Sequence, residues 1–184
     1  VSGHVVSRLP EEVVSVTSGD FQTWRWAHAA WLNPDKWPSS VAFFRDRLAF
    51  GQGQTVWFSQ AGDYENFKTK DFGEQLPSSA FEVLVQSGHG DPVEWLVPTQ
   101  KLLAGTGGSV HAIGEAATNQ AFGPANARQE DQVMPGSSGV QPVLAGAVLY
   151  AETSGRILNA AGFSVEDNKF TAQDLTVFAE HITR

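Results

Sequence analysis

The residues that could carry acid–base chemistry in this chain are four carboxylates, Asp63, Glu65, Glu94 and Asp174. A pair of such groups can hydrolyse a glycosidic bond when the two carboxylates flank it at a fixed separation. The sequence contains nothing that would hold any two of them at that separation. Acidic residues in turns usually cap backbone amides or face water. We therefore predict no catalytic residue, and a polysaccharide-degrading activity remains as an alternative.

Metal ligands are sparse in the sequence. The chain has no cysteine, so it has no disulfide and no thiolate metal site. The histidines lack the short spacing of a zinc-binding helix; they are His4, His28, His89, His111 and His181. His111 falls in a predicted strand and is interpreted as a packed or solvent-facing residue. The segment from Asp63 to Asn66 is too short for a calcium loop. We predict no metal site.

Two glycine-rich segments superficially resemble loops that cradle phosphate. Gly105–Ser109 lacks the Gly-Lys-Ser/Thr ending of such a loop, and it joins two predicted strands rather than opening a helix. Gly51–Gln54 shares these features, so both segments predict hairpin turns. Ser109 and Ser137 lack the Gly-x-Ser-x-Gly elbow that exposes a nucleophile. We predict no cofactor and no enzymatic activity.

Length and charge narrow the classes of protein that the chain could belong to. Its 184 residues are 41% hydrophobic, which suits a globular domain with its own core. A net charge of −8 argues against non-specific nucleic-acid binding, which needs clustered Lys and Arg. We find no transmembrane run and no signal peptide. The chain opens at Val1 and its one methionine is Met134, so we expect a segment of a longer polypeptide or a processed product.

One design of apolar strand, tight turn and apolar strand recurs over 43–59, 96–113 and 144–160. Gly51, Gly105 and Ala151 hold equivalent places in the three stretches. The steps between them are 54 residues (105 − 51) and 46 residues (151 − 105). Four-stranded propeller blades recur at roughly 40–50 residues. A unit of this kind cannot bury both of its faces alone, so neighbours must stack.

These repeats predict an all-β fold in which residues 1–184 form a single domain, a partial β-propeller of antiparallel blades. Blade-like units are expected at about 41–86, 93–116 and 140–170. The irregular stretch 114–139 predicts a long loop or an insertion. Gly107, Gly108 and Gly155 are expected to adopt positive φ in tight turns.

Two further elements are expected near the ends of the chain. Residues 13–17 have the β-branched character of a strand. At the other end, Leu175, Phe178, Ala179 and Ile182 recur at helical spacing. Thr171 stands three residues before Asp174 and resembles a capping box. A short amphipathic helix is predicted over about 172–182.

Tryptophan is concentrated before the first repeat, at Trp24, Trp26, Trp31 and Trp37. In a strand, Trp24 and Trp26 would point to one face. They are interpreted as buried anchors of a sheet, with a sugar-stacking platform as the alternative. Exposure of Trp24, Trp26 or Trp31 would favour that alternative.

Several strings of the sequence, taken together, resemble a known family. Arg47–Gly51, Gln54–Ser59 and Gly62–Phe67 follow the order "R-L-x-F-G … T-V-W-x-S-x-x-G-D-x-x-N-F". This order is similar to that of the tail tubular (nozzle) proteins of short-tailed bacteriophages and related prophages. Further strings agree in the family's order, so that the resemblance covers about 23–182. They are Trp24–Trp26, Trp37–Pro38, Trp95–Thr106, Val140–Arg156 and Thr171–Ile182.

This resemblance implies a virion structural role, with propellers arranged around the channel through which DNA leaves. The implied partners are other tail or portal-adaptor proteins, and a homo-oligomeric ring is implied for the full-length protein. The implied location is the virion tail, and the host cytoplasm during assembly. No catalytic, cofactor or metal residue carries over. The alternative function is a polysaccharide-binding or polysaccharide-degrading propeller module of a phage tail. The loop Gly51–Gln54 is shorter than the family's glycine-rich loop, and Ser109–His111 replaces its acidic-aromatic pair.

Overall fold

The computed structural model describes residues 37–70, 74–87, 90–116, 120–132, 134–164 and 169–177. These residues belong to a compact unit that spans Asn33–Arg184. They form twelve β-strands and, within these ranges, no helix. The prediction of an all-β fold is therefore confirmed. The expected strand at 13–17 and the residues Trp24, Trp26 and Trp31 lie outside the described residues.

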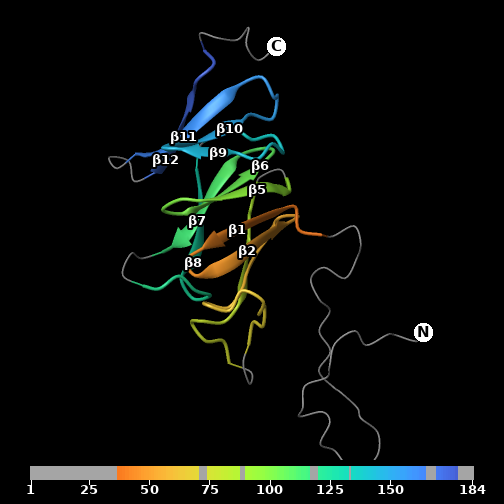
Figure 1. The fold of residues 1–184 in the computed structure, drawn as a ribbon, viewed down its shortest axis with the longest axis vertical. Helices are drawn as coiled ribbons and strands as arrows, with labels where there is room; N and C mark the ends of the chain where they lie inside the picture. The colour runs from red at the N-terminus through yellow and green to blue at the C-terminus, as the bar shows by residue number, and fades with distance from the viewer. Residues whose placement is uncertain are drawn as a thin grey trace, which may run out of the picture. The chain divides into compact units, whose positions relative to one another are not determined.

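The strands form three antiparallel sheets of four strands, and each sheet follows the order of the sequence (Figure 1). The first sheet contains β1 Ser40–Phe44, β2 Arg47–Gln52, β3 Thr55–Phe58 and β4 Phe81–Leu84. The second contains β5 Val93–Pro98, β6 Leu102–Thr106, β7 Val110–Glu115 and β8 Ala127–Asp131. The third contains β9 Val143–Ala145, β10 Ala147–Ala151, β11 Leu158–Ser164 and β12 Lys169–Asp174. The repeated stretches at 43–59, 96–113 and 144–160 thus fold alike.

Short turns set the register of these sheets. Arg45 and Asp46 connect β1 to β2 with φ of 50° and 55°, the two positive values that a type I′ hairpin turn requires. Gly146 alone separates the paired residues Ala145 and Ala147, with φ of 78°. Gly155 adopts the expected positive φ, at 69°.

The expectation of positive φ was wrong for Gly107 and Gly108, which are absent from the described residues with positive φ. The turn that holds them lies between Thr106 and Ser109, where the Thr106 amide donates to the Ser109 carbonyl oxygen at 2.9 Å. The Oγ1 atom of Thr106 accepts from the amide of Ser109 at 3.2 Å and closes the turn. The Thr106 carbonyl oxygen instead accepts from the Ser137 amide at 2.9 Å. The turn therefore departs from the two-residue hairpin with both backbone bonds, which is the geometry that requires positive φ.

The first core lies between the first and second sheets. It joins side chains of one face of the first sheet, such as Phe44 and Phe58, to Leu96, Leu102 and Ile113 of the second. β1 lies against β5, and β4 approaches β8. The two sheets therefore stack face to face in the same strand order.

The second core lies between the second and third sheets. Trp95, Leu103 and Val110 of the second sheet pack with Tyr150 and Phe170 of the third. The rings of Trp95 and Tyr150 lie with centroids 5.8 Å apart. Consequently the second sheet has both faces buried, which explains why β6 and β7 read as nearly continuous apolar runs.

Where the chain passes from one sheet to the next, the connecting segment hydrogen-bonds to a turn of the sheet that it has just left. The amides of Val85 and Val93 donate to the carbonyl oxygens of Gln54 and Gly53, each at 2.7 Å. At the next crossing, the Ser137 amide donates to the Thr106 carbonyl oxygen at 2.9 Å. Both crossings therefore use the turn between the second and third strands of a sheet.

An arginine at the start of β2 is buried, and no described carboxylate pairs with it. Nη1 of Arg47 donates to the carbonyl oxygens of Ser59 at 2.6 Å and Ser79 at 2.8 Å, and Nη2 donates to that of Pro77 at 2.8 Å. The guanidinium also lies 5.0 Å from the ring centroid of Phe81. Burial lowers the pKa of Arg47. These contacts fix the segment that returns from β3 to β4.

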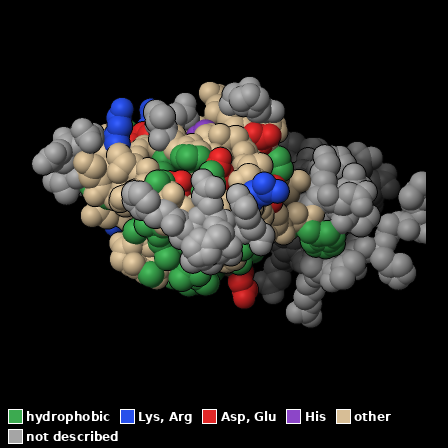
Figure 2. All heavy atoms as spheres, turned by 90° about the horizontal axis from the view of Figure 1, so that it is seen from above, with side chains coloured by type: hydrophobic (Ala, Val, Ile, Leu, Met, Phe, Trp, Pro, Cys, Tyr) green, Lys and Arg blue, Asp and Glu red, His purple; other side chains and the backbone are tan. Residues whose placement is uncertain are grey.

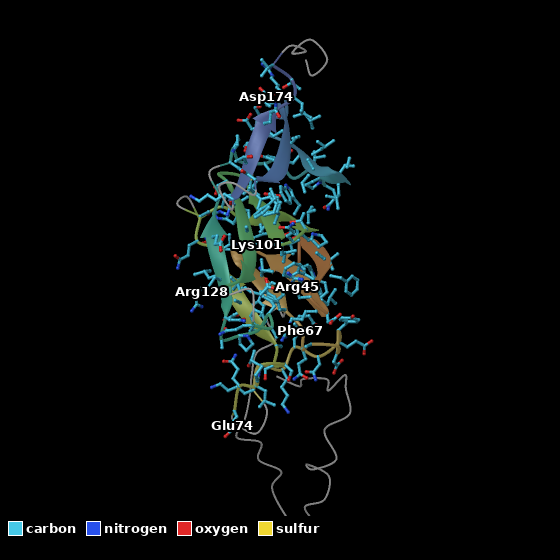
Figure 3. The ribbon with its side chains drawn as sticks, turned by 90° about the vertical axis from the view of Figure 1, so that its left-hand side faces the viewer. Arg45, Phe67, Glu74, Lys101, Arg128 and Asp174 are labelled. Atoms are coloured by element: carbon cyan, nitrogen blue, oxygen red, sulfur yellow. The ribbon has the colours of Figure 1, made fainter. Side chains whose placement is uncertain are left out.

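An ion pair joins the first two sheets at one end. Nε of Arg45 lies 2.9 Å from Oε1 of Glu115, and its Nη2 donates to the carbonyl oxygen of Gln100 at 3.3 Å. Lys101 pairs with Glu130 within the second sheet. Arg45 and Lys101 are labelled near the middle of Figure 3.

The predicted C-terminal helix is wrong for the residues that the structure describes. Residues 169–174 form β12, and residues 175–177 are not helical. In β12 the inward-facing Phe170 and Ala172 alternate with Thr171 and Gln173. The pairing of β12 with β11 therefore outweighs the helical spacing of apolar residues on which the prediction was based. Residues 178–182, the rest of the predicted helix, lie outside the described ranges. The expected loop at 114–139 contains β8, which completes the second sheet.

The first prediction concerns Gly105. A Cβ atom at this position would lie 2.1 Å from the indole of Trp95. Gly105→Ala should therefore lower the free energy of unfolding by about 1–3 kcal/mol, the usual cost of overpacking a core. Urea unfolding followed by tryptophan fluorescence measures it. Gly107→Ala is the control, because its nearest contact would be an ordinary 3.7 Å. Equal stability of the two variants would contradict the close approach.

The second prediction concerns Arg47. Arg47→Met leaves the buried carbonyl oxygens of Ser59 and Ser79 without their donor, which should cost roughly 2–4 kcal/mol of unfolding free energy. Arg156→Met, in an exposed turn, should stay within about 0.5 kcal/mol of the parent chain. Denaturant midpoints of both variants provide the test. A stable Arg47→Met variant would show that these bonds contribute little.

Candidate functional site: the two end faces of the sheet stack

Register decides which face of its sheet each strand residue occupies. Gly51 points toward the second sheet, because a Cβ there would lie 3.0 Å from Cγ1 of Val93. Gly105 points toward the third sheet, on the side of Trp95. The equivalent Ala151 should then point away from the second sheet. It does, since the adjacent Tyr150 is buried in the core between the second and third sheets.

One outward face belongs to the first sheet, and we name it the aromatic end face. Cross-strand pairing places nine side chains on it. They are Val41, Phe43, Leu48, Phe50, Gln52, Thr55, Trp57, Glu82 and Leu84. Phe43 is 62% exposed, Val41 57% and Leu84 54%. This is a sheet face of core-like composition that no described residue fully covers.

Two further aromatic rings border the aromatic end face. Tyr64 meets Phe43 edge to face with centroids 5.2 Å apart, and Phe67 lies 5.7 Å from Phe50. Both rings come from the segment that leaves β3. Among the described residues these rings cover part of the face, while Val41 and Phe43 of β1 stay more than half exposed.

The other outward face belongs to the third sheet, and we name it the small-residue end face. Pairing places on it Val143, Ala145, Ala147, Leu149, Ala151, Leu158, Ala160, Gly162, Ser164, Lys169, Thr171 and Gln173. Alanine and glycine predominate near its centre. Figure 2 views the molecule from above, the end nearest β9–β12 in Figure 1, and hydrophobic side chains reach the surface there.

The two end faces differ in charge as well as in side-chain size. Glu82 of β4 is the one ionisable strand residue on the aromatic end face, and Lys169 of β12 is its counterpart on the small-residue end face. Both strands are the fourth of their sheets. The two faces therefore carry opposite charges at equivalent strands.

The four carboxylates considered for hydrolysis come from separate parts of the fold. Asp63 and Glu65 lie after β3, Glu94 lies in β5 and Asp174 ends β12. Asp174 accepts hydrogen bonds from the amide and the hydroxyl of Thr176, at 2.6 and 2.7 Å. It thus caps a turn.

His111 is buried in a polar cluster. Its Nε2 lies 2.7 Å from Oγ of Ser109, and its Nδ1 lies 3.0 Å from Nε2 of Gln129. The amide of Gln86 donates to Oε1 of Gln129 at 2.8 Å, so the Gln129 amide group presents a donor to His111. In this arrangement Nε2 of His111 carries the proton, and the Ser109 hydroxyl accepts.

The remaining sequence candidates lie as follows. Among the described residues, no three His, Asp or Glu side chains gather as metal ligands. The segment Gly105–Ser109 is a turn between β6 and β7, and Gly51–Gln54 contains the turn between β2 and β3. Trp37 is 67% exposed, and His4, His28, His89 and His181 lie outside the described residues. None of the described segments forms a helix long and apolar enough to cross a bilayer.

The end faces were not identified from the sequence, although a signal for them was present. Val41, Ala42, Phe43 and Phe44 are apolar in succession. A strand with one solvated face alternates apolar and polar residues, so an unbroken run indicates two faces that avoid water.

Neither comparison with known proteins identifies a relative: no protein-family model matches this chain, and no curated protein matches it.

A tyrosine in the second core has a strongly shifted pKa. Burial, and secondarily the negative charge of Glu152, raise the pKa of Tyr150 from 10.0 to about 12. Its hydroxyl donates to the carbonyl oxygen of Pro135 at 3.2 Å. Tyr150 therefore reports on the integrity of the contact between the second and third sheets.

The third prediction follows from this shift. The fold favours the neutral phenol, so the stabilisation linked to Tyr150 is present below pH 10.0 and is lost as pH rises toward about 12. In a Tyr64→Phe variant Tyr150 is the one remaining tyrosine, because the chain has two. Absorbance of its phenolate in the folded protein should reach half-maximum near pH 12. Half-ionisation near pH 10.0 would contradict burial of the hydroxyl, and Tyr150→Phe should remove this part of the pH dependence.

Proposed function

We propose that this chain is a structural assembly module of a phage tail, a segment of a tail tubular (nozzle) protein whose sheets are blades of a β-propeller. In this role it contributes contact surfaces to the tail and to the channel through which DNA leaves. Its partners would be other tail or portal-adaptor proteins, and the location would be the virion.

The single observation that carries the proposal is the face-to-face stacking of three like sheets, which has at each end an apolar face that no described sheet covers. Exposed apolar patches of this kind mark surfaces where other protein docks. The first two sheets stack in the same strand order, with β1 against β5 and β4 near β8, as propeller blades do. The resemblance of the sequence to tail tubular proteins supports a phage tail as the assembly in which the chain takes part.

The charge of the chain supports a DNA conduit rather than a DNA-binding protein. The net charge is −8. DNA binds proteins that neutralise its phosphates with Lys and Arg. A channel wall that DNA must pass without adhering should instead repel phosphates, and the net negative charge of this chain has that effect.

A second candidate is a polysaccharide-binding or polysaccharide-degrading module of a phage tail, and the exposed ring of Trp37 favours it. Sugars stack on flat aromatic platforms, whereas Phe43 and Tyr64 stand at 77° to each other. Affinity electrophoresis against capsular polysaccharides would test it. Retardation that Trp37→Ala abolishes would favour this candidate over assembly.

The fourth prediction tests the assembly role. In the bacterium that encodes the chain, phage-like particles should be induced, purified on a density gradient and washed in high salt. Peptides of this chain should co-purify with the DNA-containing particles, because a tail component is held by extensive protein contacts. Deleting its coding sequence should leave heads without complete tails. An abundant acidic host protein serves as the contamination control. Recovery of the chain only in the soluble fraction would overturn the proposal.

A further inference from the structure

We infer that two copies of this chain associate through the free edge of the third sheet, where β9 of one copy pairs antiparallel with β9 of the other about a two-fold axis. The third sheets of the two copies would then form one continuous sheet. The inference goes beyond the assembly role proposed above and does not depend on it, because it uses only the edge of the third sheet.

The first argument is the free backbone of β9. This strand, Val143–Ala145, ends the third sheet and pairs with β10 on one side. On its other side, no hydrogen bond from the described part of the chain reaches these residues. An edge strand presents unpaired N–H and C=O groups, to which a strand of another molecule can add. The backbone of β9 can therefore accept one more strand.

The second argument is that β9 is exposed on both faces. Val143 is 61% exposed on the outward face of the third sheet. Leu144 pairs with Val148, which is buried in the second core, and so lies on the face toward the second sheet. Even there Leu144 is 59% exposed. Of the strands that the structure describes, β9 is the one whose residues are all exposed. A strand added beside it would remove apolar area from water on both faces.

The third argument is the absence of charge. Charged side chains on edge strands prevent pairing between molecules. Four other edge strands carry such a side chain, namely Glu82 in β4, Glu94 in β5, Arg128 in β8 and Lys169 in β12. The remaining edge strand, β1, has its inward-facing residues buried in the first core. In contrast, the stretch 140–151 that contains β9 has no Asp, Glu, Lys, Arg or His.

These properties fit a second copy of the chain as the occupant. The net charge of −8 repels copies in general, and the uncharged stretch 140–151 is where two copies can meet with little of that repulsion. Identical edges related by a two-fold axis run antiparallel, as β9 and β10 already do. With the axis at Leu144, the Leu144 side chains of the two copies lie opposite each other. Val143 of each copy then lies opposite the small Ala145 of the other.

The contact is short, and its length limits the strength of the association. Pro142 directly precedes β9 and has no N–H to donate, while Gly146 turns the chain back into β10. Pairing is therefore confined to the three residues of β9 in each copy. Stable interfaces bury about 1,200–2,000 Å², more than so few residues supply. We therefore expect a monomer–dimer equilibrium that depends on concentration rather than a permanent dimer.

The fifth prediction tests this contact on the full 184-residue chain. In sedimentation equilibrium, the average mass should rise with concentration from 19.8 kDa toward twice that value. Leu144→Lys places two positive charges directly opposite each other and should weaken dimerisation roughly tenfold or more. Leu175→Lys is the matched control, because it makes the same substitution at an exposed leucine that follows β12, the opposite edge of the sheet. It should dimerise like the parent chain.

Cross-linking provides a second measurement that does not depend on the fold of the lysine variant. The chain has no cysteine, and directly opposite residues of antiparallel strands lie within the Cα distances that a disulfide spans. Leu144→Cys should therefore form a covalent dimer under mild oxidation, well before Leu175→Cys does.

A parent chain that stays monomeric at millimolar concentration would overturn the inference. So would equally fast cross-linking of the two cysteine variants, a dimer that Leu144→Lys leaves unchanged, or a mass that grows beyond two copies. These outcomes leave the particle experiment unaffected, so failure of the dimer and failure of the assembly role are distinguishable.

Discussion

The structure depends on apolar contact between sheets, face to face. The second sheet has no solvated face: Leu102 and Ile113 belong to the first core, and Leu103 and Val110 to the second. A four-stranded sheet with two apolar faces would not persist alone, because one face would remain in water. The first and third sheets therefore stabilise the second, and the second gives each of them its one buried face.

Polar groups determine how the sheets meet, while apolar groups supply the driving force. The crossing segments are held by carbonyl oxygens of Gly53, Gln54 and Thr106, which lie in or beside turns. Each such bond contributes modestly, but it fixes which residues face each other. Arg47 does the same for the long return from β3, through four carbonyl oxygens. Removing apolar area should weaken the stack as a whole, whereas removing a bond of this kind should loosen one crossing.

Much of this architecture could be predicted from the sequence because repetition is a strong signal. The equivalence of Gly51, Gly105 and Ala151 located the second strand of every sheet. β8 could not be found in the same way, since its sequence Ala-Arg-Gln-Glu-Asp lies on an outer edge and lacks an apolar run. In β12, helical spacing and strand alternation overlapped, and only pairing with β11 decides between them.

The candidate site was harder to predict than the fold, for a physical reason. Hydrophobicity tells which residues avoid water, but it does not tell which of them find cover within the same chain. Phe43 and Phe44 are identical side chains in adjacent positions, and yet Phe44 is 5% exposed and Phe43 is 62% exposed. That difference arises from the absence of a described sheet on one side of β1, a fact of tertiary arrangement that no local pattern contains.

Apolar contact between sheet faces thus serves both the stability of the fold and the proposed assembly. Substitutions that affect assembly without affecting stability must therefore lie outside the two cores. A substitution at Leu103 or Phe58 removes contacts that the chain needs in order to fold. A substitution at Phe43 or Lys169 removes none of that buried area, because both side chains are exposed. The net charge of −8 keeps copies apart in general. The end faces are therefore the part of the molecule where exposed side chains can be changed while the three sheets keep their own cores.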